Sequence, residues 1–136
     1  MAKKVKGEKL EAKFREKHYT KASRRAYEYI VAGMRRAVTG GTCRAADRAD
    51  YEVCGKTGTA QNHGQDHSIF MGFAPMNNPK IAIAVYVENG GFGADYGVPI
   101  GALMMEQYIK GKLSPESEKR ATDFQRRRIS YGAANR

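Results

Sequence analysis

The apolar residues between positions 19 and 110 follow periods that predict a helix, three strands and a second helix, in that order. The first helix is expected to begin after Ser23, whose hydroxyl can cap it, and to end at Gly40-Gly41. Apolar residues recur in it at three- and four-residue steps and would form one face, at Tyr27, Ile30, Met34 and Val38.

Three stretches after this helix have the composition of strands. Residues 52–61 read as a strand with an unusual glycine content, and residues 68–75 are nearly all apolar, so we expect the second to be buried on both faces. Residues 81–87, Ile-Ala-Ile-Ala-Val-Tyr-Val, give the strongest strand signal. The turn residues at 76–79 predict that the last two strands form an antiparallel hairpin.

The glycine-rich segment 89–93 is expected to lead into the second helix, with Pro99 in its first turn and Gly111 at its end. We therefore divide the chain into a basic N-terminal arm at 1–18, whose structure the pattern leaves undecided, and an ordered unit at 19–110. Residues 111–136 are polar with isolated apolar residues, and this basic tail is expected to be disordered.

The chain is basic, with 24 Lys and Arg against 14 Asp and Glu, and the excess lies at the two ends. This charge raises the alternative of a non-catalytic module that binds nucleic acid or an acidic surface. Aromatic and basic residues do not interleave on any predicted strand, so nucleic acid is not the expected partner. The sequence shows neither a run of about 20 apolar residues nor a signal-peptide core, and we expect no targeting segment in it.

Cysteine and histidine offer two further candidate sites. Cys43 and Cys54 could form a disulfide if residues 43–54 make a hairpin, which would bring the two sulfurs opposite each other. His63, Asp66 and His67 could gather a zinc ion, but their glycine-bearing polar context favours a solvated loop. No metal and no cofactor is therefore expected.

The segment Cys-Gly-Lys-Thr-Gly-Thr-Ala-Gln at 54–61 has two mechanistic interpretations. The first is a phosphate-binding loop, which requires a glycine where this chain has Asp50 and a helix beginning at the Lys-Thr pair, so it is excluded. The second is the Lys-Thr-Gly element of penicillin-binding proteins and β-lactamases, which lies on a strand beside the active-site cleft. The strand predicted at 52–61 agrees with the second.

The surroundings of this tripeptide extend the match. Gly-Lys-Thr-Gly-Thr-Ala-Gln is followed by Gly-Phe-Ala-Pro, then Asn-Asn-Pro, then Val-Glu-Asn-Gly-Gly before a helix. In this order and spacing, residues 19–110 resemble the last third of the transpeptidase domain of class B penicillin-binding proteins, of the elongation type called penicillin-binding protein 2. The resemblance implies an α+β fold, in which three antiparallel strands flanked by helices form part of a penicillin-binding or serine β-lactamase-like domain.

The resemblance also implies roles for four residues. Lys56 would place a fixed cation near the substrate carboxylate and the proton-transfer network, and Thr57 would orient that network. Gly58 would let the donor peptide lie against the strand, and Thr59 would bind the carboxylate and supply one oxyanion donor. The implied ligands of the intact domain are the peptidoglycan stem peptide and β-lactams.

The sequence departs from the family in one respect. These enzymes use a Ser-x-x-Lys nucleophile motif and a Ser-x-Asn motif, and none of the five serines here begins either. We therefore expect the nucleophile and the preceding N-terminal part of the domain to lie outside this chain, and the chain alone to be inactive. We also expect it to self-associate, either through the exposed edge of the strand at 81–87 or through the helices, and the parent protein to be periplasmic and anchored to the inner membrane.

Overall fold

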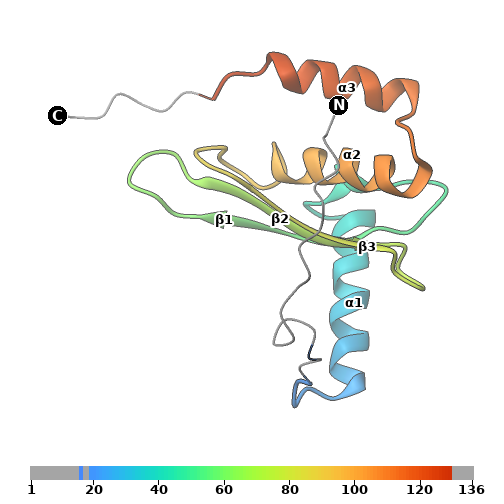
Figure 1. Cartoon of the computed structure of the whole chain (residues 1–136). Helices are drawn as coiled ribbons and strands as arrows, with labels where there is room; N and C mark the ends of the chain where they lie inside the picture. The colour runs from blue at the N-terminus through green and yellow to red at the C-terminus, as the bar shows by residue number, and fades with distance from the viewer. Residues whose placement is uncertain (1–15, 17–18, 130–136) are drawn as a thin grey trace.

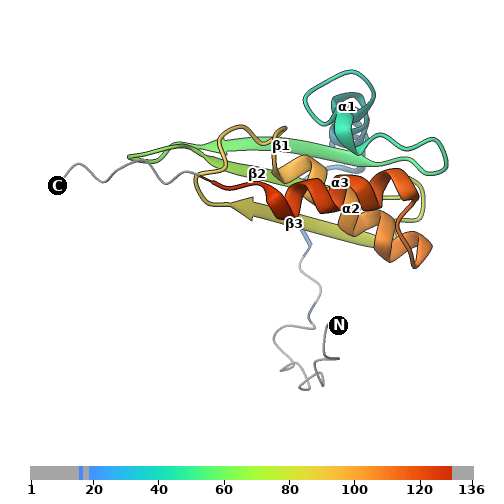
Figure 2. The same ribbon diagram turned by 90° about the horizontal axis from the view of Figure 1, so that it is seen from above.

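The computed structural model describes Glu16 and residues 19–129, and within them it shows a three-stranded sheet with helices on both faces (Figure 1). Helix α1 lies on one face, α2 covers the other, and α3 lies beyond α2 as an outer layer (Figures 1 and 2). The elements run in the order α1 (Arg24–Thr39), the 3₁₀ turn η2 (Arg44–Ala46), β1 (Cys54–Ala60), β2 (His67–Ala74), β3 (Ile81–Val87), α2 (Gly97–Lys110) and α3 (Pro115–Arg126).

The sheet has the order β1-β2-β3 with both pairs antiparallel, which confirms the predicted hairpin of β2 and β3. The register places Thr57 opposite Phe70, and Phe70 opposite Val85. Because side chains alternate between the faces of a strand, Thr57, Phe70 and Val85 point to the α2 face while Lys56 and Met71 point to the α1 face.

The core on the α2 face is organised around Phe70, which is fully buried. Three glycines enclose its ring, namely Gly55, Gly72 and Gly101, and Gly97 on α2 lies against its Cβ and backbone. A Cβ atom at Gly101 would lie 2.5 Å from Cδ1 of Phe70, and one at Gly55 would lie 2.5 Å from its Cε2. The glycines therefore let α2 approach the sheet closely around one large aromatic ring.

Helix α1 begins and ends where the sequence predicts. The Ser23 hydroxyl accepts a hydrogen bond from the N–H of Ala26, and Gly40 follows the last helical residue. Its apolar face is buried only at its C-terminal end, at Val38, whereas the Ile30 side chain is 59% exposed. Most of this face is therefore open in the part of the chain that the structure describes.

The expectation that the strand at 68–75 is buried on both faces is wrong. Residues of β2 that point toward α2 are buried, but Met71 on the other face is 54% exposed. The physical reason is that α1 contacts the sheet at the edge strand β1, so that no described element covers the α1 face of β2 and β3.

The hairpin at 43–54, on which the possible disulfide depends, does not form. Residues 44–46 make the short turn η2, β1 begins at Cys54, and β1 pairs only with β2 within the described residues. Cys43 and Cys54 are both buried free thiols. The segment turns at η2 instead, and Ala46 is fully buried in the same core cluster as Cys43.

The tail beyond Lys112 also differs from the expectation of disorder, because it forms helix α3 up to Arg126. Ser114 caps this helix, accepting a hydrogen bond from the N–H of Ser117, and Pro115 occupies its first turn. Residues 1–15 of the predicted N-terminal arm lie outside the described part of the chain. Among the described residues, no helix has both the length and the apolar character needed to span a membrane.

Candidate functional site

The four predicted site residues lie together on β1. Lys56, Thr57, Gly58 and Thr59 occupy consecutive positions of this strand, with Lys56 and Thr59 exposed and Thr57 and Gly58 half-buried. Since β1 is an edge strand with β2 on one side only, its other edge is open among the described residues. The ammonium of Lys56 donates a hydrogen bond to the carbonyl of Thr57.

Two contacts from the end of α1 hold β1 in place. The Oγ1 atoms of Thr42 and Thr57 are 2.8 Å apart, so the loop after α1 is hydrogen-bonded to the site itself. Arg35 donates to the carbonyl of Val53, the residue before β1, at 3.0 Å, and both its terminal nitrogens lie 3.2 Å from Oδ1 of Asp47. This paired contact with one carboxylate fixes the approach to β1.

The glycine-rich loop between β3 and α2 supports β1 from the α2 face. A Cβ atom at Gly93 would lie 2.8 Å from the carbonyl oxygen of Gly58 and 3.0 Å from Cβ of Thr57. The buried hydroxyl of Ser68 anchors the same loop, donating to the carbonyl of Phe92 at 2.8 Å and accepting from the N–H of Gly97 at 3.0 Å. The glycine-rich loop is therefore held in place against the α2 face of β1.

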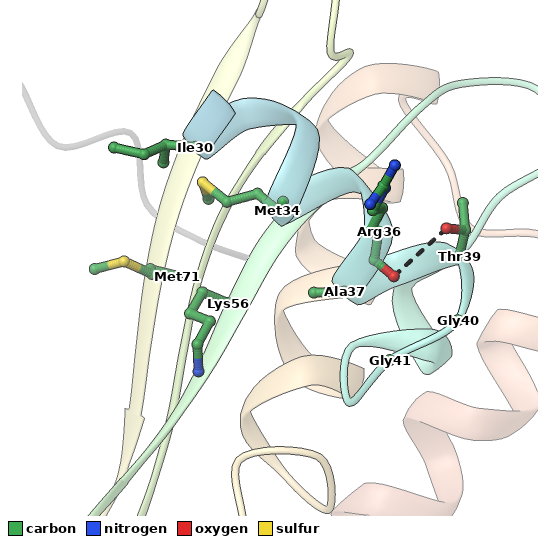
Figure 3. Close-up of a pocket in the computed structure, with 10 residues that line it drawn as sticks. Ile30, Met34, Arg36, Ala37, Thr39, Gly40, Gly41, Lys56 and Met71 are labelled. Atoms are coloured by element: carbon green, nitrogen blue, oxygen red, sulfur yellow. Dashed lines mark hydrogen bonds between the residues drawn. The ribbon is translucent and has the colours of Figure 1, made fainter. Parts of the chain in front are cut away.

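A groove of about 840 Å³ lies between α1 and the sheet, with Lys56 as part of its wall (Figure 3). Apart from Arg36, Thr39 and Lys56, its lining consists of apolar residues and glycines, namely Ile30, Gly33, Met34, Ala37, Gly40, Gly41 and Met71. Figure 3 shows Met34 from α1 and Met71 from β2 close to Lys56. An open apolar groove beside an exposed cation is a place where a further segment or ligand can pack.

The competing sequence interpretations do not fit this geometry. Lys56 is on a strand, and no helix begins at Lys56-Thr57, as a phosphate-binding loop would require. Among residues 16 and 19–129, no three His, Cys, Asp or Glu side chains cluster closely enough to hold a metal ion. His67 instead accepts a hydrogen bond at Nδ1 from the backbone N–H of Asn89 at 3.0 Å.

Sequence reasoning found the motif but missed the residues that position it. Thr42, Arg35 and Gly93 act on β1 from segments 15 to 36 positions away, and only the fold brings them there. The signal for Gly93 was present as a glycine-rich loop, but the sequence does not say what that loop packs against. Arg35 and Thr42 carry no local signal, because isolated Arg and Thr residues are common on helix surfaces and in loops.

The comparisons with known proteins identify the family of the chain. Residues 1–107 match the model of the penicillin-binding protein transpeptidase domain. The peptidoglycan D,D-transpeptidase MrdA of Haemophilus influenzae is 32% identical over 122 residues, covering 76% of this chain and 19% of the relative. The crystal structure of PBP2 from Pseudomonas aeruginosa has 41% sequence identity and a TM-score of 0.57, covering 66% of this chain and 21% of that one.

An imipenem acyl-enzyme complex of penicillin-binding protein A from Mycobacterium tuberculosis is also similar. It has a TM-score of 0.50 and 29% identity, and the match covers 62% of this chain and 18% of that one. The chain thus spans about a fifth of the length of the relatives it matches.

The three-stranded antiparallel sheet with helices on both faces is a piece of an α+β domain of the penicillin-binding protein type. The chain belongs to the penicillin-binding protein transpeptidase domain family, and its relatives are of the penicillin-binding protein 2 type. The α+β class with three antiparallel strands flanked by helices is confirmed.

Proposed function

We propose that this chain supplies the substrate-binding strand of a D,D-transpeptidase that cross-links peptidoglycan through an acyl-serine intermediate. The observation that carries the proposal is the position of Lys56, Thr57, Gly58 and Thr59 on an open edge strand beside a groove. An edge strand can add a peptide as a further strand, and this would hold the donor stem peptide in an extended form.

The backbone geometry supports an oxyanion role for Thr59. The ammonium of Lys56 reaches the Thr57 carbonyl, which indicates that this carbonyl faces the open edge rather than β2. Backbone groups of alternate strand residues point to the same edge, so the N–H of Thr59 also faces outward. An outward N–H on a rigid strand can stabilise the negative charge that develops on the attacked carbonyl.

Lys56 and the hydroxyls of Thr57 and Thr59 supply the groups that would bind the carboxylate of the ligand. A fixed cation and two hydroxyl groups within four residues suit a ligand that ends in a carboxylate, such as a stem peptide or an opened β-lactam. Acylation also needs a serine nucleophile, and no serine in this sequence begins a Ser-x-x-Lys or a Ser-x-Asn motif. The nucleophile therefore lies outside the chain, and the 136 residues alone form no acyl-enzyme.

Labelling with a fluorescent penicillin tests this division of roles. We expect no covalent label on the 136-residue chain, and stoichiometric label on a longer polypeptide that joins it to an upstream segment containing Ser-x-x-Lys. Peptide mass spectrometry should locate the label on the serine of that upstream motif. A label on any serine of this chain, such as Ser68, would refute the proposal.

The uncovered surfaces are the proposed contact sites of the rest of the domain. The outer edge of β3 is open among the described residues, and a second groove of about 650 Å³ runs beside it. This groove is lined mainly by apolar residues, namely Ile81, Leu103, Met104, Gln107, Tyr108 and Leu113. In the absence of the preceding part of the domain, this edge should pair with a second copy, and a monomeric sedimentation profile at high concentration would contradict that.

The substrate also sets the location of the parent protein. Peptidoglycan is assembled outside the cytoplasmic membrane, so we place the parent enzyme on the periplasmic side and anchored to the inner membrane. Fusion of a topology reporter to the C-terminus of the full-length parent tests this, and a cytoplasmic reporter signal would contradict it.

A further inference from the structure

Helix α3 lies outside residues 1–107, the part of the chain that matches the transpeptidase family. In its middle, Arg120 donates a hydrogen bond to the carbonyl of Ala45 at 3.5 Å. A cavity of about 350 Å³ lies between the C-terminal half of α3 and the start of α2 with its preceding loop, and it is lined by Ala45, Ala94, Asp95, Pro99, Arg120, Phe124 and Arg127. Further contacts attach the two ends of the helix.

The N-terminal end of α3 is attached to a carboxylate buried in α2. Glu106 is 1% exposed, and its oxygens accept hydrogen bonds from the N–H of Ser114 at 2.9 Å and the hydroxyl of Ser117 at 2.6 Å. Arg48 donates to the same carboxylate at 3.3 Å. This attachment holds the start of α3 to the C-terminal part of α2 (Figure 1).

The C-terminal end of α3 packs on the loop that backs the site. The rings of Phe124 and Tyr96 meet edge to face with their centroids 5.9 Å apart. The guanidinium of Arg127 lies 4.2 Å from the centroid of Phe124, and it donates to the carbonyl of Asp95 at 3.4 Å. Aromatic and cation–π contacts of this kind fix one segment against another.

Tyr96 and Asp95 belong to the segment that continues from Gly93, and Gly93 is packed against the backbone of Gly58 and the Cβ atom of Thr57. The N–H of Val98 donates to the carbonyl of Gly93 at 2.9 Å, so the loop and the start of α2 form one folded turn. Phe124 therefore contacts Tyr96, which lies three residues along the chain from Gly93, and Gly93 in turn packs against Thr57 and Gly58.

We propose that α3 is a brace that presses the 92–96 loop against the Lys-Thr-Gly strand, with Phe124 and Arg127 as its positioning residues. The inference rests on the proposed function for the role of the strand, while the brace itself is a property of this chain. An added peptide strand needs β1 to hold one position, and the brace limits the movement of β1 away from its ligand.

Hydrogen exchange of the 136-residue chain, read by mass spectrometry of peptides, tests the brace directly. Phe124→Ala should speed exchange by about fivefold in peptides covering 89–97 and also in those covering 54–60, and leave α1 unchanged. Phe124→Tyr keeps the aromatic contact and should restore protection. Asp123→Ala, at the neighbouring exposed position of the same helix, is the matched control and should have no effect.

Arg127→Ala provides a second variant that leaves the helix intact, because this residue follows the last residue of α3. It should produce a smaller change of about threefold in the same two regions. Faster exchange in 89–97 with none in 54–60 would overturn the brace, because α3 would then hold only the loop. A uniform rise that includes α1 would also overturn it, because it would indicate general destabilisation.

A second readout separates failure of the brace from failure of the proposed function. In a longer polypeptide that carries the nucleophile, Phe124→Ala should lower the rate constant of penicillin acylation about fivefold without changing the labelling stoichiometry. An unchanged rate constant would overturn the role of the brace in the site. If the unmodified longer polypeptide is not acylated at all, the proposed function fails, and the exchange measurement still decides whether α3 braces β1.

Discussion

The side-chain hydroxyls of Thr42 and Thr57 lie 2.8 Å apart and join the loop after α1 to the middle of the Lys-Thr-Gly strand. Because one hydroxyl must donate to the other, the Thr57 hydroxyl has a preferred orientation before any ligand arrives. Thr42 is 15 residues from Thr57 in the sequence and belongs to no recognised motif. The site strand is thus positioned by residues that the motif does not contain.

Replacing Thr42 by valine removes this hydrogen bond and keeps the shape of the side chain. We expect Thr42→Val to lower the free energy of unfolding by about 0.5 to 1 kcal/mol, since the pair is partly exposed to water. Thr39→Val is the matched control, because its hydroxyl bonds only to carbonyls of its own helix, and its effect should be close to zero. Urea denaturation measures both changes, and equal values would show that the Thr42 contact contributes nothing.

Glycines around Phe70 should not tolerate a methyl group. In Gly101→Ala the new Cβ would lie 2.5 Å from the Phe70 ring, so we expect a loss of about 1 to 2 kcal/mol after the gain in helix propensity is included. Gly33→Ala on α1 is the matched control, because nothing lies within 4 Å of its Cβ, and it should gain about 0.5 to 1 kcal/mol. Thermal denaturation of the two variants should therefore shift in opposite directions. A Gly101→Ala variant as stable as the unmodified chain would contradict the proposed close packing.

Glu106 should make stability depend on pH in the acidic range. Burial alone would raise its pKa, but hydrogen bonds from Ser117 and Ser114 and the charge of Arg48 outweigh burial and lower it from the ordinary 4.5 to about 2. The folded state therefore binds fewer protons than the unfolded state, so this stabilisation is complete above pH 4.5 and is lost as the pH falls toward 2.

Glu106→Gln should accordingly cost about 3 kcal/mol at neutral pH, because it breaks a buried charged network, and should flatten the decline in stability on acidification. Glu116→Gln, at a side chain that is 85% exposed, is the control and should leave both quantities unchanged. Unfolding by urea at a series of pH values measures the effect. If the stability of the Glu106→Gln variant fell with pH in the same way as that of the unmodified chain, Glu106 would not be the group responsible.

Much of the fold follows from local rules that the sequence displays. Ser23 and Gly40 bound α1, Gly111 ends α2 in the left-handed conformation, and the alternation in Ile81–Val87 defines β3. Each of these features depends on neighbouring residues alone, so reading the sequence was sufficient. The strand that carries Lys56 to Thr59 could be predicted for a similar reason, because its residues are contiguous in the sequence.

The features that were missed depend on contacts between distant segments. Helix α3 has few apolar residues, and its position depends on Ser117 and Phe124 meeting Glu106 and Tyr96, which no local pattern reveals. The disulfide prediction assumed that residues 43–54 return on themselves, whereas the segment is fixed by Arg35 and by burial of Ala46. Tertiary packing decided both cases.

The two cysteines should behave as unreactive thiols. Burial raises the pKa of Cys43 and of Cys54, so both are protonated at neutral pH and attack thiol reagents slowly. We expect slow labelling of the native chain, and rapid labelling of both thiols after denaturation in the absence of a reductant. Denatured protein without titratable thiols would show that the disulfide forms after all.

The central claim is that Lys56 presents its charge to the ligand of an acyl-transfer site whose serine lies elsewhere. Its most direct test is the rate constant of acylation by a fluorescent penicillin, measured on a longer polypeptide that contains both these residues and a Ser-x-x-Lys motif. Lys56→Ala should lower that constant by about 100-fold or more, as loss of a charge-stabilising group does, while Lys80→Ala in the exposed turn before β3 should leave it unchanged. Equal rate constants for the two variants would contradict the claim.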